Sequence, residues 1–117
     1  MALPGLLMNA VGMIGSSYNY MPEIFVDLYN AYCASDLRLA QSLQFEANRI
    51  SYAVKKIGNL SAYKVVLGMR GIDVGDCRPP SLPLANKELE GLKSVVMEYE
   101  KRLTAVDFSE GRTSLPQ

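Results

Sequence analysis

A short apolar run, Val-Gly-Met-Ile at residues 11–14, limits most strongly what this chain can fold into. Its length, and the glycines and serines that flank it, predict a buried strand ending in a tight Gly-Ser-Ser turn. No convincing partner strand exists elsewhere in the chain. An unpaired buried strand leaves backbone N–H and C=O groups unsatisfied, at a cost comparable to lost hydrogen bonds. We therefore expect the chain to be part of a larger protein, or to complete its sheet with another chain.

Helical periodicity dominates the remaining sequence, so the predicted fold class is mostly α with one β-strand. Residues 2–10 resemble the last turns of an apolar helix. Apolar positions then recur three or four apart in four further segments, 24–32, 39–57, 62–69 and 89–106. The expected helix signals are N-caps at Ser35-Asp36, Ser61 and Asn86, and a stop at Gly58. Residues 73–84 are rich in proline and are expected to form an ordered loop.

The composition excludes several classes of function. Twelve basic and twelve acidic side chains cancel, and no basic stripe is visible, so a nucleic-acid partner is not expected. Histidine is absent, which removes the commonest general base and metal ligand. Cys33 and Cys77 lack the paired spacing of a zinc or redox site and are expected to be buried or half-buried thiols. No metal and no cofactor is therefore predicted.

The first fifteen residues are apolar enough to suggest a signal peptide. The first basic residue is Arg38, however, so the positive region of a signal peptide is missing. The stretch is also too short to span a bilayer and contains Pro4 and Gly5. We therefore interpret it as interior protein, with no membrane partner and a cytoplasmic location.

Residues 5–19, Gly-Leu-Leu-Met-Asn-Ala-Val-Gly-Met-Ile-Gly-Ser-Ser-Tyr-Asn, resemble part of the N-acetylneuraminate lyase family, from the seventh helix to the eighth strand. The likeness continues through residues 34–44, Lys64 and the Cys-Arg-Pro and Leu-Pro-Leu segments of 77–84, and covers roughly residues 3–106. That family belongs to a superfamily of pyruvate aldolases that includes dihydrodipicolinate synthase. The Gly-Ser-Ser-Tyr-Asn segment is closer to the sialic acid branch than to the dihydrodipicolinate branch.

The resemblance implies a (β/α)8 TIM barrel with extra C-terminal helices, of which this chain would be the C-terminal part. Residues 1–20 would be the end of the seventh helix and the eighth strand. Residues 21–106 would be the C-terminal helices, and 107–117 a polar tail. Family members are commonly homotetramers, so the resemblance also implies a homo-oligomer or association with a complementing barrel.

The activity implied by the resemblance is that of a class I aldolase. Such an enzyme cleaves sialic acid to N-acetylmannosamine and pyruvate through a lysine Schiff base. The family's catalytic lysine and tyrosine lie on earlier strands, so no catalytic residue is expected in this chain. By position, Ser16 matches the family serine that hydrogen-bonds the hydroxyl-bearing tail of the sugar, and it is the one predicted substrate-binding residue. Strand ends are where barrel enzymes place their active sites.

Other interpretations remain open. Ser16 and Ser17 could simply form the turn, Tyr18 and Asn19 could brace it, and Lys64 is expected to be a partly buried or salt-bridged structural lysine. Arg78 could anchor its loop to a carboxylate. As a whole, the chain could be a non-catalytic helical interaction module, a truncated isoform, or part of another pyruvate aldolase such as a dihydrodipicolinate synthase.

Overall fold

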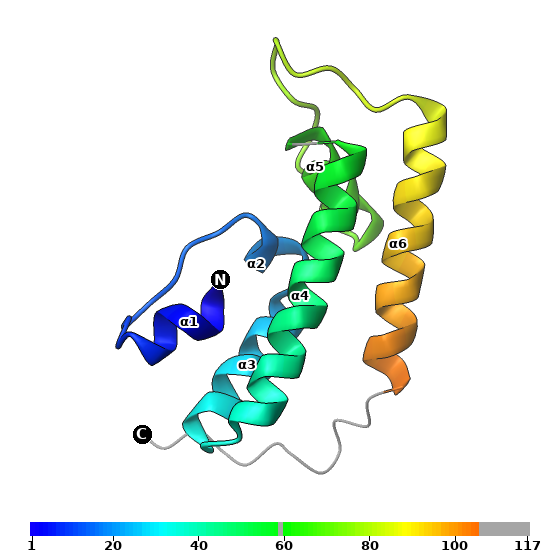
Figure 1. The fold of residues 1–117 in the computed structure, drawn as a ribbon. Helices are drawn as coiled ribbons and strands as arrows, with labels where there is room; N and C mark the ends of the chain where they lie inside the picture. The colour runs from blue at the N-terminus through cyan, green and yellow to red at the C-terminus, as the bar shows by residue number, and fades with distance from the viewer. Residues whose placement is uncertain (59, 106–117) are drawn as a thin grey trace.

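The computed structural model describes residues 1–58 and 60–105, and the side chains of residues 1–58 and 60–101. The described residues form six helices: α1 (Ala2–Leu7), α2 (Ser17–Tyr20), α3 (Pro22–Cys33), α4 (Leu37–Ile57), α5 (Leu60–Met69) and α6 (Asn86–Ala105). The long helix α4 is central, with α3 and α6 packed along it and α1 resting on α3 and α4 (Figure 1). Helix α5 contacts α2, α4 and α6. The prediction of a mostly α chain is confirmed.

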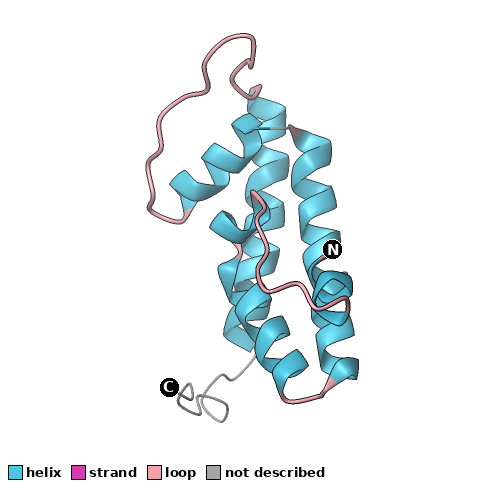
Figure 2. Cartoon of the chain, turned by 90° about the vertical axis from the view of Figure 1, so that its left-hand side faces the viewer, coloured by secondary structure: helices cyan, strands magenta, loops and turns pink. Residues whose placement is uncertain are grey.

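The strand expected at residues 11–14 is not formed. Across the described residues the chain contains helices and loops alone, and this segment is an irregular loop between α1 and α2 (Figure 2). Within that same part of the chain, no backbone hydrogen bond involves residues 11–14. The side chains of Val11 and Ile14 are fully exposed. The predicted strand is therefore wrong for this chain by itself, because a strand requires a neighbour to complete its ladder and none of the described residues provides one.

Helix α1 ends at Leu7, three residues before the expected end. Asn9 adopts a left-handed conformation with φ of 63°. Its N–H donates to the Leu6 carbonyl, and the Ala10 N–H donates to the Gly5 carbonyl, both at 2.9 Å. These two bonds form a Schellman motif, which satisfies carbonyls at the helix end and turns the chain away. Asparagine tolerates the left-handed region better than most residues, so this stop was readable from the sequence.

Asp36 joins α3 to α4 by making hydrogen bonds at the end of α3 and at the start of α4. Its side chain accepts a hydrogen bond from the Leu39 N–H at 3.0 Å, which confirms the predicted N-cap. Its own N–H donates to the Ala31 carbonyl at 2.9 Å and closes the end of α3, with Ser35 in the left-handed region at φ of 60°. The tight connection directs α4 back along α3, and this pair makes the largest helix contact in the molecule.

Two predicted caps are wrong. Ser61 lies inside α5, and its hydroxyl donates to the Leu82 carbonyl at 2.7 Å, so it ties the following loop to the helix. Asn86 is the first residue of α6 and not its cap. The Glu88 carboxylate instead accepts a hydrogen bond from the Ala85 N–H at 2.7 Å. This bond is the acidic half of a capping box, and it makes Ala85 the N-cap in place of the predicted Asn86.

The predicted stop of α4 at Gly58 is confirmed. A Cβ atom at this position would lie 2.6 Å from a methyl carbon of Leu84. The Leu84 side chain would therefore have to move to admit a side chain at position 58, because the loop that leads to α6 packs against the end of α4. Residues 73–84, expected to form an ordered loop, lie outside any helix.

The core is divided into two clusters along α4. The larger joins α2, α3, α4, α5 and α6, and the smaller joins α1, α3 and the first turn of α4. Leu92 and Leu28 are completely buried, one in each cluster. Burial of a leucine side chain contributes about 1.5–3 kcal/mol. The buried residues of the larger cluster are Tyr20, Met21, Ile24, Ala47, Ile50, Val54, Ala62, Val66, Leu92, Val96 and Tyr99. Those of the smaller are Ala2, Leu3, Leu6, Leu28, Ala31 and Ala40.

The helical stripes are confirmed in part. Leu92, Val96 and Tyr99 on the apolar stripe of α6 are buried, whereas Tyr29 of α3 and Tyr52 of α4 are largely exposed. The side chain of Leu103, Val106 and the predicted polar tail at 107–117 lie outside the part of the chain that is described. Among the described helices, none combines the length and apolar character that a membrane crossing requires.

Candidate functional site

Ser16 lies at the start of the short helix α2, directly after the loop that replaces the predicted strand. Its backbone is already helical, with φ of −60° and ψ of −33°. The turn is held by backbone bonds at 3.2 Å, from the Tyr18 N–H to the Gly15 carbonyl and from the Asn19 N–H to the Ser16 carbonyl. The Ser16 side chain makes no cap hydrogen bond, and the residue is exposed. Its hydroxyl is therefore free to bind a ligand.

Two tyrosines attach this turn to the helices behind it. The Tyr18 ring meets Phe25 of α3 edge to face, with ring centroids 4.1 Å apart. The Tyr20 ring is buried and stacks on Tyr63 of α5 at 5.5 Å. Tyr18 thus braces the turn as expected, whereas Asn19 is exposed. The sequence analysis did not assign a role to Tyr20.

A cluster of two charged side chains and a tyrosine secures the other end of α2. Arg70, which follows α5, donates from Nη1 to the Tyr20 carbonyl at 2.5 Å and to Glu23 Oε2 at 3.1 Å. Its Nη2 donates to Glu23 Oε1. The Tyr99 hydroxyl of α6 donates to Glu23 Oε2 at 3.0 Å, and its ring centroid lies 5.9 Å from the guanidinium carbon of Arg70. The cluster therefore links α2, α3, α5 and α6.

The electrostatics of this cluster favour the ion pair. Burial alone would raise the pKa of Glu23, but the hydrogen bonds from Arg70, its own backbone N–H and Tyr99, with the charge of Arg70, lower it overall. The hydrogen bond to Glu23 raises the pKa of Arg70. Burial and the Glu23 charge raise the pKa of Tyr99. At neutral pH the pair is thus charged and the phenol keeps its proton.

Neither Glu23 nor Arg70 was identified from the sequence. Each is a charged residue beside an apolar stretch: Glu23 is the first charged side chain of the chain, and Arg70 follows the apolar helix α5. A charged side chain beside an apolar stretch needs a partner when it is buried. This requirement could have predicted that Glu23 and Arg70 form a pair.

Lys64 has a structural role in this fold. Its Nζ donates to the backbone carbonyls of Val74 at 3.2 Å and Asp76 at 2.7 Å, so it holds the loop before α6 against α5. It lines an open cavity of about 730 Å³ between that loop and the helices. These bonds agree with the structural interpretation of Lys64, except that its partners are carbonyls and not a carboxylate.

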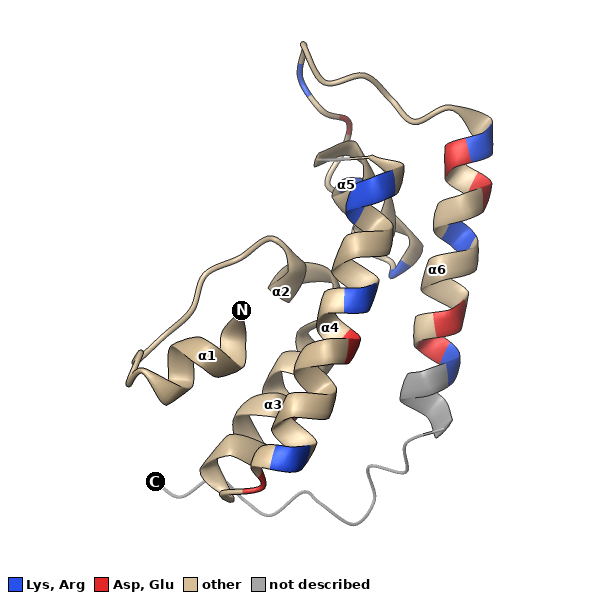
Figure 3. Ribbon diagram, viewed as in Figure 1, with Lys and Arg blue, Asp and Glu red and all other residues tan. Residues whose placement is uncertain are grey.

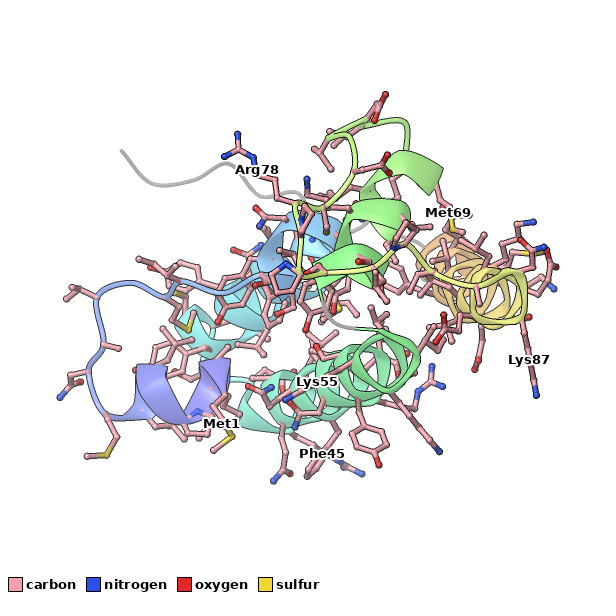
Figure 4. All side chains as sticks on the ribbon, turned by 90° about the horizontal axis from the view of Figure 1, so that it is seen from above. Met1, Phe45, Lys55, Met69, Arg78 and Lys87 are labelled. Atoms are coloured by element: carbon pink, nitrogen blue, oxygen red, sulfur yellow. The ribbon has the colours of Figure 1, made fainter. Side chains whose placement is uncertain are left out.

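The remaining candidates are not brought together. Arg78 is exposed and extends from its loop away from the helices (Figure 4), and no bond from its side chain to another described residue is found. The predicted anchoring of the loop by Arg78 is thus not supported. Cys77 is half-buried as expected, but Cys33 is exposed, and both thiols are free. The described residues contain no group of three or more side chains suited to hold a metal ion.

The surface beside Ser16 is apolar. A shallow groove of about 380 Å³ lies between the loop before α2 and the outer face of α3. Residues 1–22 contain no charged side chain, and Figure 3 shows α1, α2 and the loop between them without charge. The groove is lined by Met13, Tyr18, Pro22, Phe25, Val26, Tyr29 and Asn30.

The chain is similar in sequence to several aldolases and synthases. An N-acetylneuraminate lyase of Rhizobium meliloti (strain 1021) is 34% identical over 96 residues, which cover 82% of this chain and 32% of that protein. An N-acetylneuraminate lyase of Escherichia coli O1:K1 / APEC is 36% identical over 95 residues, 80% of this chain and 32% of that protein. A 2-dehydro-3-deoxy-D-gluconate/2-dehydro-3-deoxy-phosphogluconate aldolase of Thermoproteus tenax is 33% identical over 93 residues, 79% of this chain and 30% of that protein.

The chain spans about a third of the length of these curated relatives. No solved structure gives a significant match. The model of the dihydrodipicolinate synthetase family matches residues 1–99, the greater part of the chain. Together with the relatives above, this match shows that the chain belongs to the dihydrodipicolinate synthetase family.

Proposed function

We propose that this chain is the C-terminal portion of a class I pyruvate aldolase of the N-acetylneuraminate lyase type, and that Ser16 contacts the substrate. The observation that carries the proposal is the Ser16 side chain at the start of α2. In a chain of this family, Ser16 is exposed and its hydroxyl makes no capping hydrogen bond. A free hydroxyl can exchange hydrogen bonds with the hydroxyl groups of a sugar acid. The lyases at 34% and 36% identity support sialic acid as the substrate.

The bond-breaking chemistry in this proposal belongs to residues outside the chain. A lysine amine attacks the ketone carbon of the sugar acid, water leaves, and the resulting imine accepts the electron pair of the cleaved carbon–carbon bond. A tyrosine transfers protons. Lys64 is not proposed for this role, because its ammonium is engaged with the carbonyls of Val74 and Asp76. Ser16 then binds and orients the sugar tail, and no metal or cofactor is needed.

A complementing barrel is the proposed partner of the chain. The segment at residues 11–14 has no backbone hydrogen bonds to other described residues, and its Val11 and Ile14 side chains are exposed. Pairing with a neighbouring strand would satisfy these backbone groups and bury the two side chains. In the complete barrel this segment forms the eighth strand and residues 21–106 form the C-terminal helices. The assembled protein is a cytoplasmic homo-oligomer.

The first test is the size and chemistry of the native protein. An antibody to α6 should detect a species of at least about 250 residues, which a complete barrel requires. That protein should release pyruvate from N-acetylneuraminate. Borohydride reduction with pyruvate should trap an adduct on a lysine outside residues 1–117. A trapped adduct on Lys64 would overturn the assignment of the catalytic lysine.

The role of Ser16 is tested by substitution in the same protein. Loss of one hydrogen bond of about 0.5–1.5 kcal/mol should raise KM for N-acetylneuraminate about two- to tenfold in Ser16→Ala. The pyruvate adduct should form normally, because pyruvate does not carry the sugar tail. Ser17→Ala, one residue into α2, is the matched control. An unchanged KM in Ser16→Ala would show that Ser16 only forms the turn.

A second function is favoured by a different observation. The two hydrophobic clusters join all six described helices, which supports a helical interaction module or truncated isoform that folds without a barrel. A native species near 12.9 kDa that melts cooperatively as a monomer would favour the module. Self-association and binding of hydrophobic dyes by the isolated chain would favour the barrel portion. Release of pyruvate from a sugar acid other than N-acetylneuraminate, or a synthase activity, would indicate another member of the family.

A further inference from the structure

We infer that Arg70 is a positioning residue that orients Ser16 by holding α2 in place. This inference rests on the proposed contact between Ser16 and the substrate. Helix α2 contains only four residues, and a helix of one turn has little stability of its own. Its position must come from contacts made by its ends and side chains with the rest of the fold.

Arg70 supplies the contact at the C-terminal end of α2. Carbonyls in the last turn of a helix have no partner within the helix, and the guanidinium donates to the carbonyl of Tyr20 at 2.5 Å. Ser16 precedes the other end of the same turn. A displacement of the Tyr20 carbonyl therefore moves the whole short helix, and Ser16 with it.

The guanidinium is itself fixed by α3 and α6. It pairs with Glu23 through both terminal nitrogens, and the Tyr99 hydroxyl donates to the same carboxylate. The side chains of Arg70 and Glu23 are only 21% and 35% exposed, so solvent competes weakly for these bonds. Helices α3 and α6 thus fix the guanidinium, and the guanidinium holds the C-terminal end of α2.

The geometry requires arginine and not merely a positive charge. A planar guanidinium can bind a carboxylate and a carbonyl at the same time, whereas a lysine ammonium is a single point charge without this fork. A lysine at position 70 should keep the attraction to Glu23 but lose the hydrogen bond to the Tyr20 carbonyl. The variant Arg70→Lys therefore separates positioning of α2 from stability of the fold.

The test compares Arg70→Lys with Arg49→Lys. Arg49 pairs with Glu46 and Glu98 on the exposed side of α4 and α6, so its variant makes the same chemical change away from α2. In the native protein, Arg70→Lys should raise KM for N-acetylneuraminate about three- to tenfold, equivalent to about one weakened hydrogen bond. It should leave kcat within about twofold and the borohydride-trapped pyruvate adduct unchanged. Arg49→Lys should change none of these values.

Hydrogen exchange on the 117-residue chain gives an independent measurement. Arg70→Lys should speed exchange of the Tyr18, Asn19 and Met21 amides, which bond within the turn, and leave the amides of α4 unchanged. Unchanged exchange at α2, or an unchanged KM with wild-type activity present, would overturn the inference. Equal effects of the two variants would also overturn it.

Failure of the proposed function would look different. The wild-type protein would then give neither a pyruvate adduct nor cleavage, while faster exchange in Arg70→Lys would still show that Arg70 positions α2. Parallel loss of kcat and of thermal stability in Arg70→Lys would instead show a purely structural role and contradict the inference.

Discussion

Residues 1–22 and the helices that follow them differ in charge and in how their apolar side chains pack. The first region has no charged side chain, and it leaves Leu7, Met8, Val11 and Ile14 largely exposed. The second carries all the charged residues, and its apolar side chains form most of the larger cluster between α3, α4, α5 and α6. The first region is held at a few points, and the second is packed along the full length of α4.

The difference teaches that apolar content does not by itself produce a core. In α4 the apolar positions recur with the helical period, so one face is buried while the opposite face, where Phe45 points outward in Figure 4, is exposed to solvent. The segment at residues 11–14 is suited to a strand, and a strand is buried only with neighbours on its sides. The exposed side chains of Val11 and Ile14 are therefore consistent with the complementing barrel proposed above.

The largest expected effect comes from the residue that unites the two regions. Leu28 of α3 is completely buried in the cluster with Leu3 and Leu6 of α1. Leu28→Ala should lower the free energy of unfolding by about 2–5 kcal/mol, because it leaves a cavity. Urea unfolding followed by circular dichroism measures this change. Val26→Ala, two residues earlier and more than half exposed, should change it by less than about 0.5 kcal/mol, and similar losses in both variants would show that α1 does not pack on α3 in solution.

A smaller effect is expected from acid, through the cluster at Glu23. Its pKa is lowered in the folded state, so its stabilising contribution is complete above its ordinary value of 4.5 and is lost as the pH falls through the folded value. Since both partners are partly exposed, we expect about 1 kcal/mol or less.

The Glu23 contribution is isolated by comparing the wild type with Glu23→Gln in urea unfolding from pH 7 to pH 3. The comparison is needed because burial, with the charge of Glu23, raises the pKa of Asp27, which acts in the opposite direction. The stability difference between the two proteins should shrink below pH 4.5. A difference that stays constant down to pH 3 would contradict the assigned ion pair.

The smallest effect on stability is expected in the segment that lacks a partner. The double variant Val11→Ser, Ile14→Ser should change the free energy of unfolding of the 117-residue chain by less than about 0.5 kcal/mol, because both side chains are fully exposed. It should nevertheless reduce dye binding and self-association. A loss of more than about 1 kcal/mol would show that these side chains pack within the chain and would weaken the contrast between the two regions.

Much of the fold was predictable from local signals. The helical period located α3 to α6, and the Asp36 cap and the Gly58 stop were read correctly, because each depends on residues a few positions away. The caps at Ser61 and Asn86 were wrong, because the Ser61 hydroxyl has a partner 21 residues away in Leu82, and because Glu88 reaches back to the N–H of Ala85. The turn at Ser16 was also predictable, but the hydrogen bond from Arg70 that holds the other end of α2 was not.

The sequence by itself determined most of the helices and the turn that carries Ser16, since periodicity and capping act over short distances. Only the tertiary structure decided which distant groups meet. Arg70 lies 47 residues from Glu23 in sequence, and Tyr99 lies 76 residues from it. Pairings of this kind depend on how α5 and α6 pack on α2 and α3, and the free energy of that packing is shared among many side chains that no local pattern of the sequence displays.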